Sequence, residues 1–503
     1  MRHNESQQQG LRLSILPEPG PDAGAGALRA FRARFHQCLR ARSDALFKLA
    51  DAVLCSSGPV VSLPGLSLTG VFTRGHGALY DALAAGRIDA DRLRDALATQ
   101  PLGRVSGRIV LAVNTTGWLR PDANCSPGRL YCHGSGHGRG QDQMVPGWSY
   151  SFVAALEPGA SSWTQILDAT RIGPDDDPAA VTALQLRAVI DRLTSAGQHR
   201  SGDAPIAVVT DGGYDVPRLA WQLRDLPVII VGRLKSDRVL YGRPGPWSGR
   251  GRPPKHGRAC RMADPDTWGG PDTASSTETA RYGRLEAMAW ENLHSRLTHR
   301  AAWIGHEGDL PIIEATLIRL KTERLPHTGK PTPLWLWTSQ QALDTDLLNA
   351  IWSAWLRRFD IEHTFRFLKQ TLGWTIPQVR DPEAADRWTW LVIAAFTQLG
   401  LARALAADRR LPWEAPAGPG RLTPPRPRPP GFPEPSRGPA PTHCGAETLQ
   451  TRARKACRAT QSAQSTDPRP GQESQTRQDH KRTRTAPDQH QRSKIKLRAG
   501  ECA

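Results

Sequence analysis

Paired cysteines, long apolar runs and an apolar N-terminus are all lacking in this chain of 503 residues. Its eight cysteines are scattered without CxxC spacing, which argues against a disulfide framework and a standard zinc module. The most apolar run, WTWLVIAAFTQLGLARALAA, contains Gln398 and Arg403 and predicts a buried helix, not a membrane span. The first residues, MRHNESQQQG, have no secretory signal pattern. We therefore expect a cytoplasmic protein without a membrane partner.

Acidic residues are also fewer than basic ones. The chain has 66 Lys+Arg against 48 Asp+Glu, a net charge of +18, which favours a polyanionic partner and a nucleoid-associated location. Residues 411–503 alone hold 17 Lys+Arg against 8 Asp+Glu. Cys125, Cys132, His133 and His137 lie close in sequence, but a Gly-rich loop without a second ligand pair favours an ordinary loop over a metal cluster.

The N-terminal part has helical periodicity. Apolar residues from Leu28 to Leu54 predict one long amphipathic helix, and its other face is rich in arginine. Two short helices are expected at Ala78–Ala85 and Ala90–Ala98, with Asp89 as the N-cap. This pair fits a helix-turn-helix or an ordinary helical hairpin, and the looseness of the motif favours the hairpin.

From Arg108 the pattern changes to strands. Apolar, β-branched runs predict strands at 108–116, 148–157, 163–172, 205–211 and 226–234, with helices at 177–196 and 216–226. A basic Gly/Pro-rich loop follows, which includes Arg250, Arg252 and Lys255 and could straddle a phosphate backbone. Further strands are expected at 299–306, 310–320 and 332–339, and further helices at 344–372 and 383–409.

The helix 344–372 carries the most specific pattern. Arg358, Glu362 and Lys369 stand at i, i+4 and i+11, so they share one helical face within about 60°. A carboxylate between cations suits a site where a metal ion meets a phosphodiester. A solvated face with an i,i+4 ion pair has the same pattern, so this motif alone does not decide.

Together with Trp355, these residues resemble the Tyr-Arg-Glu-Lys signature of the DDE-type insertion-sequence transposases, with Trp355 in place of the tyrosine. Segments 108–120 and 205–220 resemble other boxes of that family in the right order, and the resemblance covers about residues 1–412. It implies an α/β, RNase H-like catalytic core that cuts and joins DNA with Mg²⁺ (or Mn²⁺). It further implies metal ligation by Asp211 and Glu362, and DNA contacts by Arg358, Lys369 and Trp355.

The expected organisation follows from the patterns and the resemblance together. We expect, in order, a flexible lead (1–26), a helical N-terminal DNA-binding domain (27–103), the first part of the RNase H-like core (104–234), a strand-rich insertion with a basic loop (235–343), closing helices of the core (344–411) and a disordered basic tail (412–503). A tail of this composition also arises when a GC-rich gene is read out of frame.

Position 114 departs from the family pattern. The segment LAVNTTGW resembles the first acidic box, where the family has Asp, but Asn114 stands there, and an amide is a much poorer metal ligand. The expected function is a DNA transposase whose partners are duplex DNA at element ends and target, with a homodimer as one arrangement on DNA. Two alternatives stay open: an inactive DNA-binding remnant and a stand-alone RNase H-like nuclease.

Overall fold

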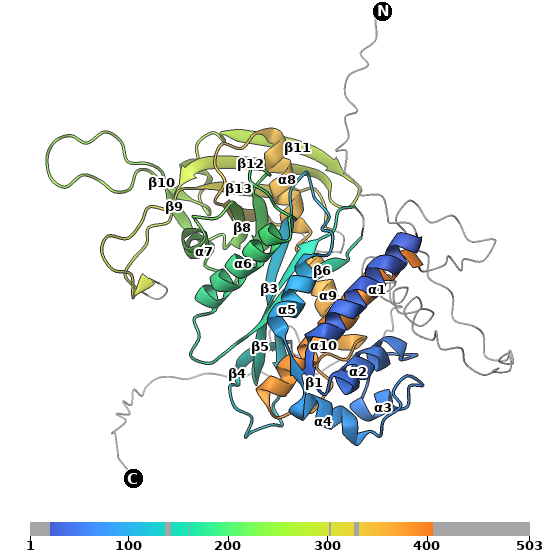
Figure 1. The fold of residues 1–503 in the computed structure, drawn as a ribbon. Coiled ribbons are helices and arrows are strands. Elements are labelled where there is room, and N and C mark those ends of the chain that lie inside the picture. Colours follow the sequence, from blue (N-terminus) through green and yellow to red (C-terminus); the bar gives the residue numbers. More distant parts are fainter. Residues whose placement is uncertain (1–20, 136–141, 160, 301–302, 326–330, 406–503) are drawn as a thin grey trace, which may run out of the picture. The chain divides into compact units, whose positions relative to one another are not determined.

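The computed structural model describes residues 21–135, 142–159, 161–300, 303–325 and 331–405 (Figure 1). Most of the expected flexible lead, the expected basic tail and His137 lie outside the described residues.

The N-terminal part is helical, as expected, but its first helix is interrupted. It contains α1 (Pro21–Cys38), α2 (Ser43–Cys55), α3 (Leu63–Ser67), α4 (Gly77–Ala85) and α5 (Ala90–Ala98). The prediction of one helix from Leu28 to Leu54 is wrong. Between α1 and α2 the chain forms β1 (Leu39–Ala41), which pairs with β2 (Arg87–Ile88), and Arg42 then takes a φ of 55°. A left-handed residue cannot continue a right-handed helix.

The short pair α4 and α5 confirms the second expectation. The Asp89 carboxylate caps α5 by accepting a hydrogen bond of 3.2 Å from the Arg92 backbone N–H. Helices α1, α2 and α4 pack against α10 (Pro382–Leu401) and bury residues such as Phe35, Leu46 and Leu83. The apolar faces of these helices therefore belong to the same core as the C-terminal helix.

One mixed sheet forms the centre of the described residues. Its strands follow the order β11-β12-β13-β14-β8-β7-β3-β5, and β4 and β6 both pair with β5. The strands expected from the apolar runs are β3 (Val110–Leu119), β5 (Asp142–Leu156), β6 (Thr164–Ile172), β7 (Ile206–Thr210) and β8 (Val228–Leu234). β3 is parallel to β7 and β7 to β8, while β3–β5 and β5–β6 are antiparallel. This arrangement is consistent with an RNase H-like core, as expected.

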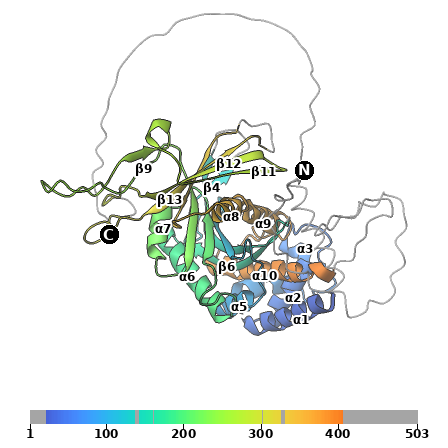
Figure 2. The same cartoon turned by 90° about the horizontal axis from the view of Figure 1, so that it is seen from above.

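Helices cover both faces of this sheet (Figures 1 and 2). α6 (Pro178–Ser195) and α7 (Val216–Gln222) pack on one face with residues such as Leu186 and Leu219. α8 (Thr345–Leu356), α9 (Phe359–Gln370) and α10 pack on the other with Trp352, Phe365 and Trp388. The parts of the strands that lie between these helices are buried on both sides, which explains their apolar runs.

The insertion prolongs the same sheet. β14 (Leu334–Thr338) pairs antiparallel with β8, and β13 (Ala315–Thr322), β12 (Gly283–Leu293) and β11 (Thr273–Thr279) follow outward. The strand expected at 299–306 is wrong for its described part, because Trp303–His306 forms turns. The sequence interpretation missed β4 (Leu130–Ser135), β11 and β12.

The helix expected over 344–372 is divided in two. α8 ends at Leu356 and α9 begins at Phe359, with a turn at Arg357 and Arg358 between them. The Arg358 N–H bonds to the Trp355 carbonyl at 3.0 Å and the Ile361 N–H to the Arg358 carbonyl at 3.1 Å. These i→i−3 bonds tighten the backbone where an α-helix would have i→i−4 bonds.

Candidate active site

The two-residue period of β3 decides which way Asn114 faces. Val110 and Ala112 belong to the core beneath α8–α10, whereas Leu111 and Val113 belong to the core beneath α6 and α7. Side chains alternate between the faces of a strand, so the same period places Asn114 on the side of α9.

Asp211 follows the neighbouring strand on the same side. On β7, Val209 packs in the core beneath α8–α10, so Asp211, two residues further on, continues that face. The last parallel pair between the two strands is Val113↔Thr210. Asn114 and Asp211 are the next residue on each, so they lie side by side at the edge where β7 ends beside the middle of β3. Such an edge is a common ligand site in α/β folds.

Arg358 connects this edge to α9. Its Nη2 lies 3.5 Å from the Asp211 Oδ1, and its Nη1 donates a 2.9 Å hydrogen bond to the Glu362 Oε1. The Asp211 and Glu362 side chains are 43% and 44% exposed, but Arg358 is only 2% exposed. One buried guanidinium therefore holds two half-exposed carboxylates at the same place, although these residues come from parts of the chain 151 positions apart.

The guanidinium has aromatic neighbours and one unused donor. Its central carbon lies 4.6 Å from the ring centre of Phe359 and 5.3 Å from that of Trp355. Among the described atoms, the buried Arg358 Nε has no hydrogen-bond partner. A buried cation of this kind keeps its position through packing, and its carboxylate partners offset part of its desolvation.

Trp355 anchors the preceding helix to the sheet. Its indole N–H donates a buried 2.9 Å hydrogen bond to the Thr210 carbonyl, the residue before Asp211. Trp355 is 3% exposed, so in this conformation its ring contacts protein and is not available to stack on a base. The bond fixes the end of α8, and with it Arg358, relative to the end of β7.

Lys369 reaches β3 two residues beyond Asn114. Its Nζ donates a 2.7 Å hydrogen bond to the Thr116 Oγ1, and it lies 5.7 Å from the ring centre of Trp374. Burial lowers the pKa of the Lys369 ammonium from its ordinary value, and Cys132 opposes this shift. The cation is therefore held in an environment that solvates it poorly, within the same face as Asn114 and Glu362.

The donor atoms suit one divalent ion better than two. Mg²⁺ is commonly held by one or two carboxylates together with water and substrate phosphate oxygens, which Asp211 and Glu362 can provide. A second ion needs a further anionic ligand, and Asn114 provides only an amide, whose Oδ1 accepts a 2.9 Å hydrogen bond from the Thr115 N–H. Within the described part of the chain, no three His, Cys, Asp or Glu side chains form a group that could hold a metal ion.

The basic loop residues lie apart from this site. Arg250, Arg252 and Lys255 belong to the segment between β9 (Val239–Tyr241) and β10 (Ala259–Arg261), and all three are exposed. Lys255 forms a 3.0 Å ion pair with Asp309.

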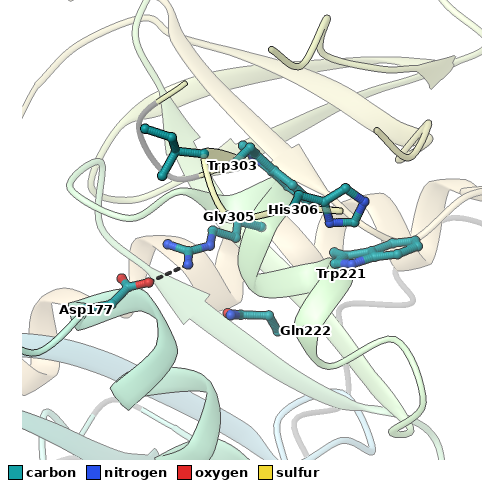
Figure 3. Close-up of a pocket in the computed structure, with 8 residues that line it drawn as sticks. Asp177, Trp221, Gln222, Trp303, Gly305 and His306 are labelled. Carbon is teal, nitrogen blue, oxygen red and sulfur yellow. Dashed lines mark hydrogen bonds and ion pairs between the residues drawn. The ribbon is translucent and has the colours of Figure 1, made fainter. Parts of the chain in front are cut away.

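A cavity of about 620 Å³ is lined by Asp177 just before α6, by α7 and by the turn at 303–306 (Figure 3). None of Asn114, Asp211 and Glu362 lines it. Its lining combines a cation–carboxylate pair with aromatic rings: Asp177, Arg218, Trp221, Gln222, Trp303, Ile304, Gly305 and His306. Arg218 and Asp177 form an ion pair across it. The cavity is therefore separate from the candidate active site, which lies where β7 ends beside β3.

Residues 34–296 match the profile of a family described as DDE superfamily endonuclease, and the chain belongs to that family. The family implies a nuclease that acts on DNA and generally uses divalent metal ions. Asn114 and Asp211 lie inside the matched region, whereas α9 with Glu362 lies beyond it. No curated protein matches the chain. None of the described helices is long and apolar enough to cross a membrane.

The sequence interpretation missed Thr116 and the bridging position of Arg358. Thr116 could have been found, because it stands two residues after Asn114 on the same face of a strand. The contact between Arg358 and Asp211 depends on the turn between α8 and α9, which no local sequence pattern indicated.

Proposed function

We propose that the protein is a DNA transposase of the insertion-sequence branch marked by the Tyr-Arg-Glu-Lys signature. It would cleave DNA at element ends and transfer the 3′-hydroxyl to a target. The observation that supports this most is the contact of one buried Arg358 with both Asp211 and Glu362. It brings together the two acidic residues that the family resemblance pairs, although only one lies in the matched region.

Each residue of the site has a distinct task in this proposal. Asp211 and Glu362 hold Mg²⁺ or Mn²⁺, which, when bound, activates the attacking water or hydroxyl and stabilises the leaving oxygen. Arg358 keeps the two carboxylates aligned. Lys369, on the same face, holds a phosphate oxygen of the DNA backbone as a point charge.

A second candidate is an inactive, DNA-binding relative of such an enzyme, and Asn114 is the observation that favours it. A two-metal site with only two carboxylates leaves much of the metal charge unbalanced. A stand-alone nuclease is the other alternative. It would cut DNA without joining the 3′-end to a second duplex, so a strand-transfer assay separates it from a transposase.

The test compares the natural protein with Asn114→Asp. The substitution is nearly isosteric and adds a third anionic ligand, so we expect it to raise Mg²⁺-dependent cleavage of a plasmid carrying the DNA that flanks the gene. Without Mg²⁺ the variant should be less stable, because three carboxylates repel one another. Mg²⁺ at 100-fold its Kd should then stabilise it by about 3 kcal/mol, measured as a shift in melting temperature.

Two controls accompany it. Asn124→Asp adds the same charge at an exposed loop position and should change neither cleavage nor the Mg²⁺ response. Asp211→Asn should abolish the Mg²⁺ response. If the natural protein cleaves as fast as Asn114→Asp, position 114 is not a ligand. If neither protein cleaves or joins DNA, the transposase proposal fails for this chain and the inactive relative is the better account.

A further inference from the structure

The segment between β9 and β10 is a long basic arm, defined here as residues 242–258. In both Figure 1 and Figure 2 it extends away from the strands that carry it. No acidic residue occurs between Asp237 and Asp264, while seven cations do: Arg238, Arg243, Arg250, Arg252, Lys255, Arg258 and Arg261. Charge of one sign on a projecting segment indicates a polyanionic partner.

The root of the arm is held tightly. The Gly242 N–H bonds to the Arg258 carbonyl at 3.0 Å and the Gly257 N–H to the Gly242 carbonyl at 2.9 Å. A Cβ at Gly257 would lie 2.0 Å from the Arg243 carbonyl oxygen, so only glycine permits this approach. The Arg243 Nη2 donates a 2.6 Å hydrogen bond to the Oε2 of Glu314, the residue before β13, which fixes one side of the root to that strand.

The tip of the arm is built differently. Within the described residues, no hydrogen bond or ion pair joins 244–254 to another segment, and Arg250 and Arg252 are exposed. Gly249 and Gly251 have φ values of +79° and +74°, and a Cβ at either would meet nothing within 4 Å. Residues 249–252 of the tip are therefore a slim stretch of alternating glycine and arginine, preceded by the exposed Trp247 and followed by Pro253 and Pro254.

The dimensions of this tip fit the DNA minor groove. That groove is about 6 Å wide, too narrow for a helix or a strand pair but wide enough for a single backbone whose neighbours are glycines. Even a fully extended chain advances only about 7 Å over two residues, and base pairs repeat every 3.4 Å, so Arg250 and Arg252 would contact the groove within about two base pairs of each other. Pro253 and Pro254 have a fixed φ and keep the following chain extended.

Arginine in the minor groove has a sequence preference. A·T-rich DNA has a narrow minor groove with enhanced negative potential, which attracts inserted arginine, and it lacks the guanine 2-amino group that obstructs the groove floor. We propose that Arg250-Gly251-Arg252 inserts into the minor groove of A·T-rich DNA. This inference rests on the proposed function for its ligand, duplex DNA. The arm then selects where the protein binds, at a distance from Asp211 and Glu362.

The experiment measures binding of the full chain to short duplexes in EDTA, where metal-dependent cleavage cannot occur. Three duplexes are compared: A·T-rich, G·C-rich, and one in which inosine replaces guanine. The inosine·cytosine duplex has the major groove of G·C but lacks the minor-groove amino group. We expect the A·T and inosine duplexes to bind about tenfold more tightly than the G·C duplex.

Substitutions at Arg250 and Arg252 test whether the tip causes the preference for A·T-rich DNA. Arg250→Ala/Arg252→Ala should remove most of the tenfold ratio and lower the salt slope by about two units, one for each cation. Arg250→Lys/Arg252→Lys should keep most of the salt slope but lose part of the ratio, since an ammonium lacks the flat guanidinium fork. Arg200→Ala/Arg284→Ala removes the same charge from two exposed positions elsewhere and should leave the ratio unchanged.

Equal affinity for all three duplexes, or inosine DNA that behaves like G·C DNA, overturns the inference, because phosphate contacts alone would then explain binding. Equal binding to duplex RNA overturns it too. The two proposals fail separately. A preserved A·T preference without cleavage contradicts only the transposase proposal, whereas Mg²⁺-dependent cleavage without the preference contradicts only the role given to the arm.

Discussion

At the scale of single residues, Arg358 joins the two acidic residues of the candidate site. It is 2% exposed, and its guanidinium contacts the carboxylates of both Asp211 and Glu362. In this arrangement its single positive charge offsets part of the negative charge of Asp211 and Glu362. In the proposed site it is therefore a positioning residue for Asp211 and Glu362, and its direct contact with DNA stays a prediction.

The position of Arg358 between two carboxylates predicts that its removal destabilises the fold but increases the stabilisation by Mg²⁺. Arg358→Ala should lower the free energy of unfolding by about 2 kcal/mol, less than the ~3–5 kcal/mol for breaking a fully buried pair, since both carboxylates are half exposed. Mg²⁺ should then stabilise Arg358→Ala more than the natural protein, because the ion replaces the lost cation. Arg187→Ala, which breaks the exposed pair with Asp225, controls for loss of an arginine. An equal Mg²⁺-induced shift in melting temperature for Arg358→Ala and the natural protein would separate Arg358 from the metal ligands.

Lys369 is held where burial is unfavourable for its charge. Lys369→Met keeps the chain length and removes that cost, so we expect a melting temperature no lower than that of the natural protein. The same variant should bind DNA more weakly, with a salt slope smaller by about one unit, as for one lost phosphate contact. Lys321→Met, at a 58% exposed side chain on β13, is the matched control and should keep the slope. A stability loss with an unchanged slope would assign Lys369 a purely structural role through Thr116.

At the level of elements, sequence patterns located the buried strands well. β3, β5, β6, β7 and β8 contain apolar runs where helices cover both faces of the sheet, and such runs can be recognised in the sequence. β11 (TASSTET) alternates between exposed and half-buried residues and has no such apolar run, so it was missed. The break between α1 and α2 depends on the left-handed Arg42 and on pairing of β1 with the distant β2, which a local window does not contain.

The candidate site shows the same division. Local sequence patterns indicate Asp211 and Glu362. The contact of both residues with Arg358 could not be predicted in this way, because the sheet and the α8–α9 turn bring together distant parts of the chain. The arginines of α1 and of the segment between α1 and α2 show why the partners of a charged side chain are hard to predict from sequence. Arg32, Arg34, Arg40 and Arg42 bond to Asp51, Thr99, Asp89 and Asp81. The expected DNA contacts of this part stay a prediction.

The root of the arm contains a pH-sensitive contact between elements. The His256 Nδ1 lies 2.9 Å from the His294 Nε2, a hydrogen bond that requires one ring nitrogen without a proton. Burial lowers the pKa of both imidazoles below 6.5; Arg296 and Lys255 lower that of His256 further, whereas Glu314 raises that of His294. Because the folded pKa values are depressed, this contribution to stability is complete above pH 6.5 and is lost as pH falls through the folded values.

Acidification should therefore loosen the root before the rest of the fold. We expect hydrogen exchange at the Tyr241 and His294 amides, which bond across the root, to rise below pH 6.5 after correction for intrinsic rates. His256→Asn removes one titrating ring and should flatten this pH dependence. Amides within α6 provide the internal reference. Uniform changes in the root and in α6 would show that the imidazole pair has no local effect.

For the molecule as a whole, the insertion and the N-terminal helices are connected through one core. β14 hydrogen-bonds to β8, so the insertion continues the central sheet. Leu336 of β14, Leu46 of α2 and Leu391 of α10 belong to the same apolar cluster. The expected domain boundaries at 103 and 234 stay predictions, but these contacts indicate that the segments they separate depend on one another for burial.

Leu336→Ala tests this dependence over the whole fold. Leu336 is fully buried, so its truncation should lower the free energy of unfolding by about 2–5 kcal/mol, through lost burial and the cavity left behind. If the core is continuous, calorimetry should show one transition moved to lower temperature, and amides of α1 and α10 should exchange faster along with those of β13 and β14. Ile304→Ala, at a 77% exposed position of the insertion, should leave the transition in place. A new low-temperature transition for Leu336→Ala, with exchange in α1 and α10 unchanged, would instead mean that the insertion unfolds as a domain of its own.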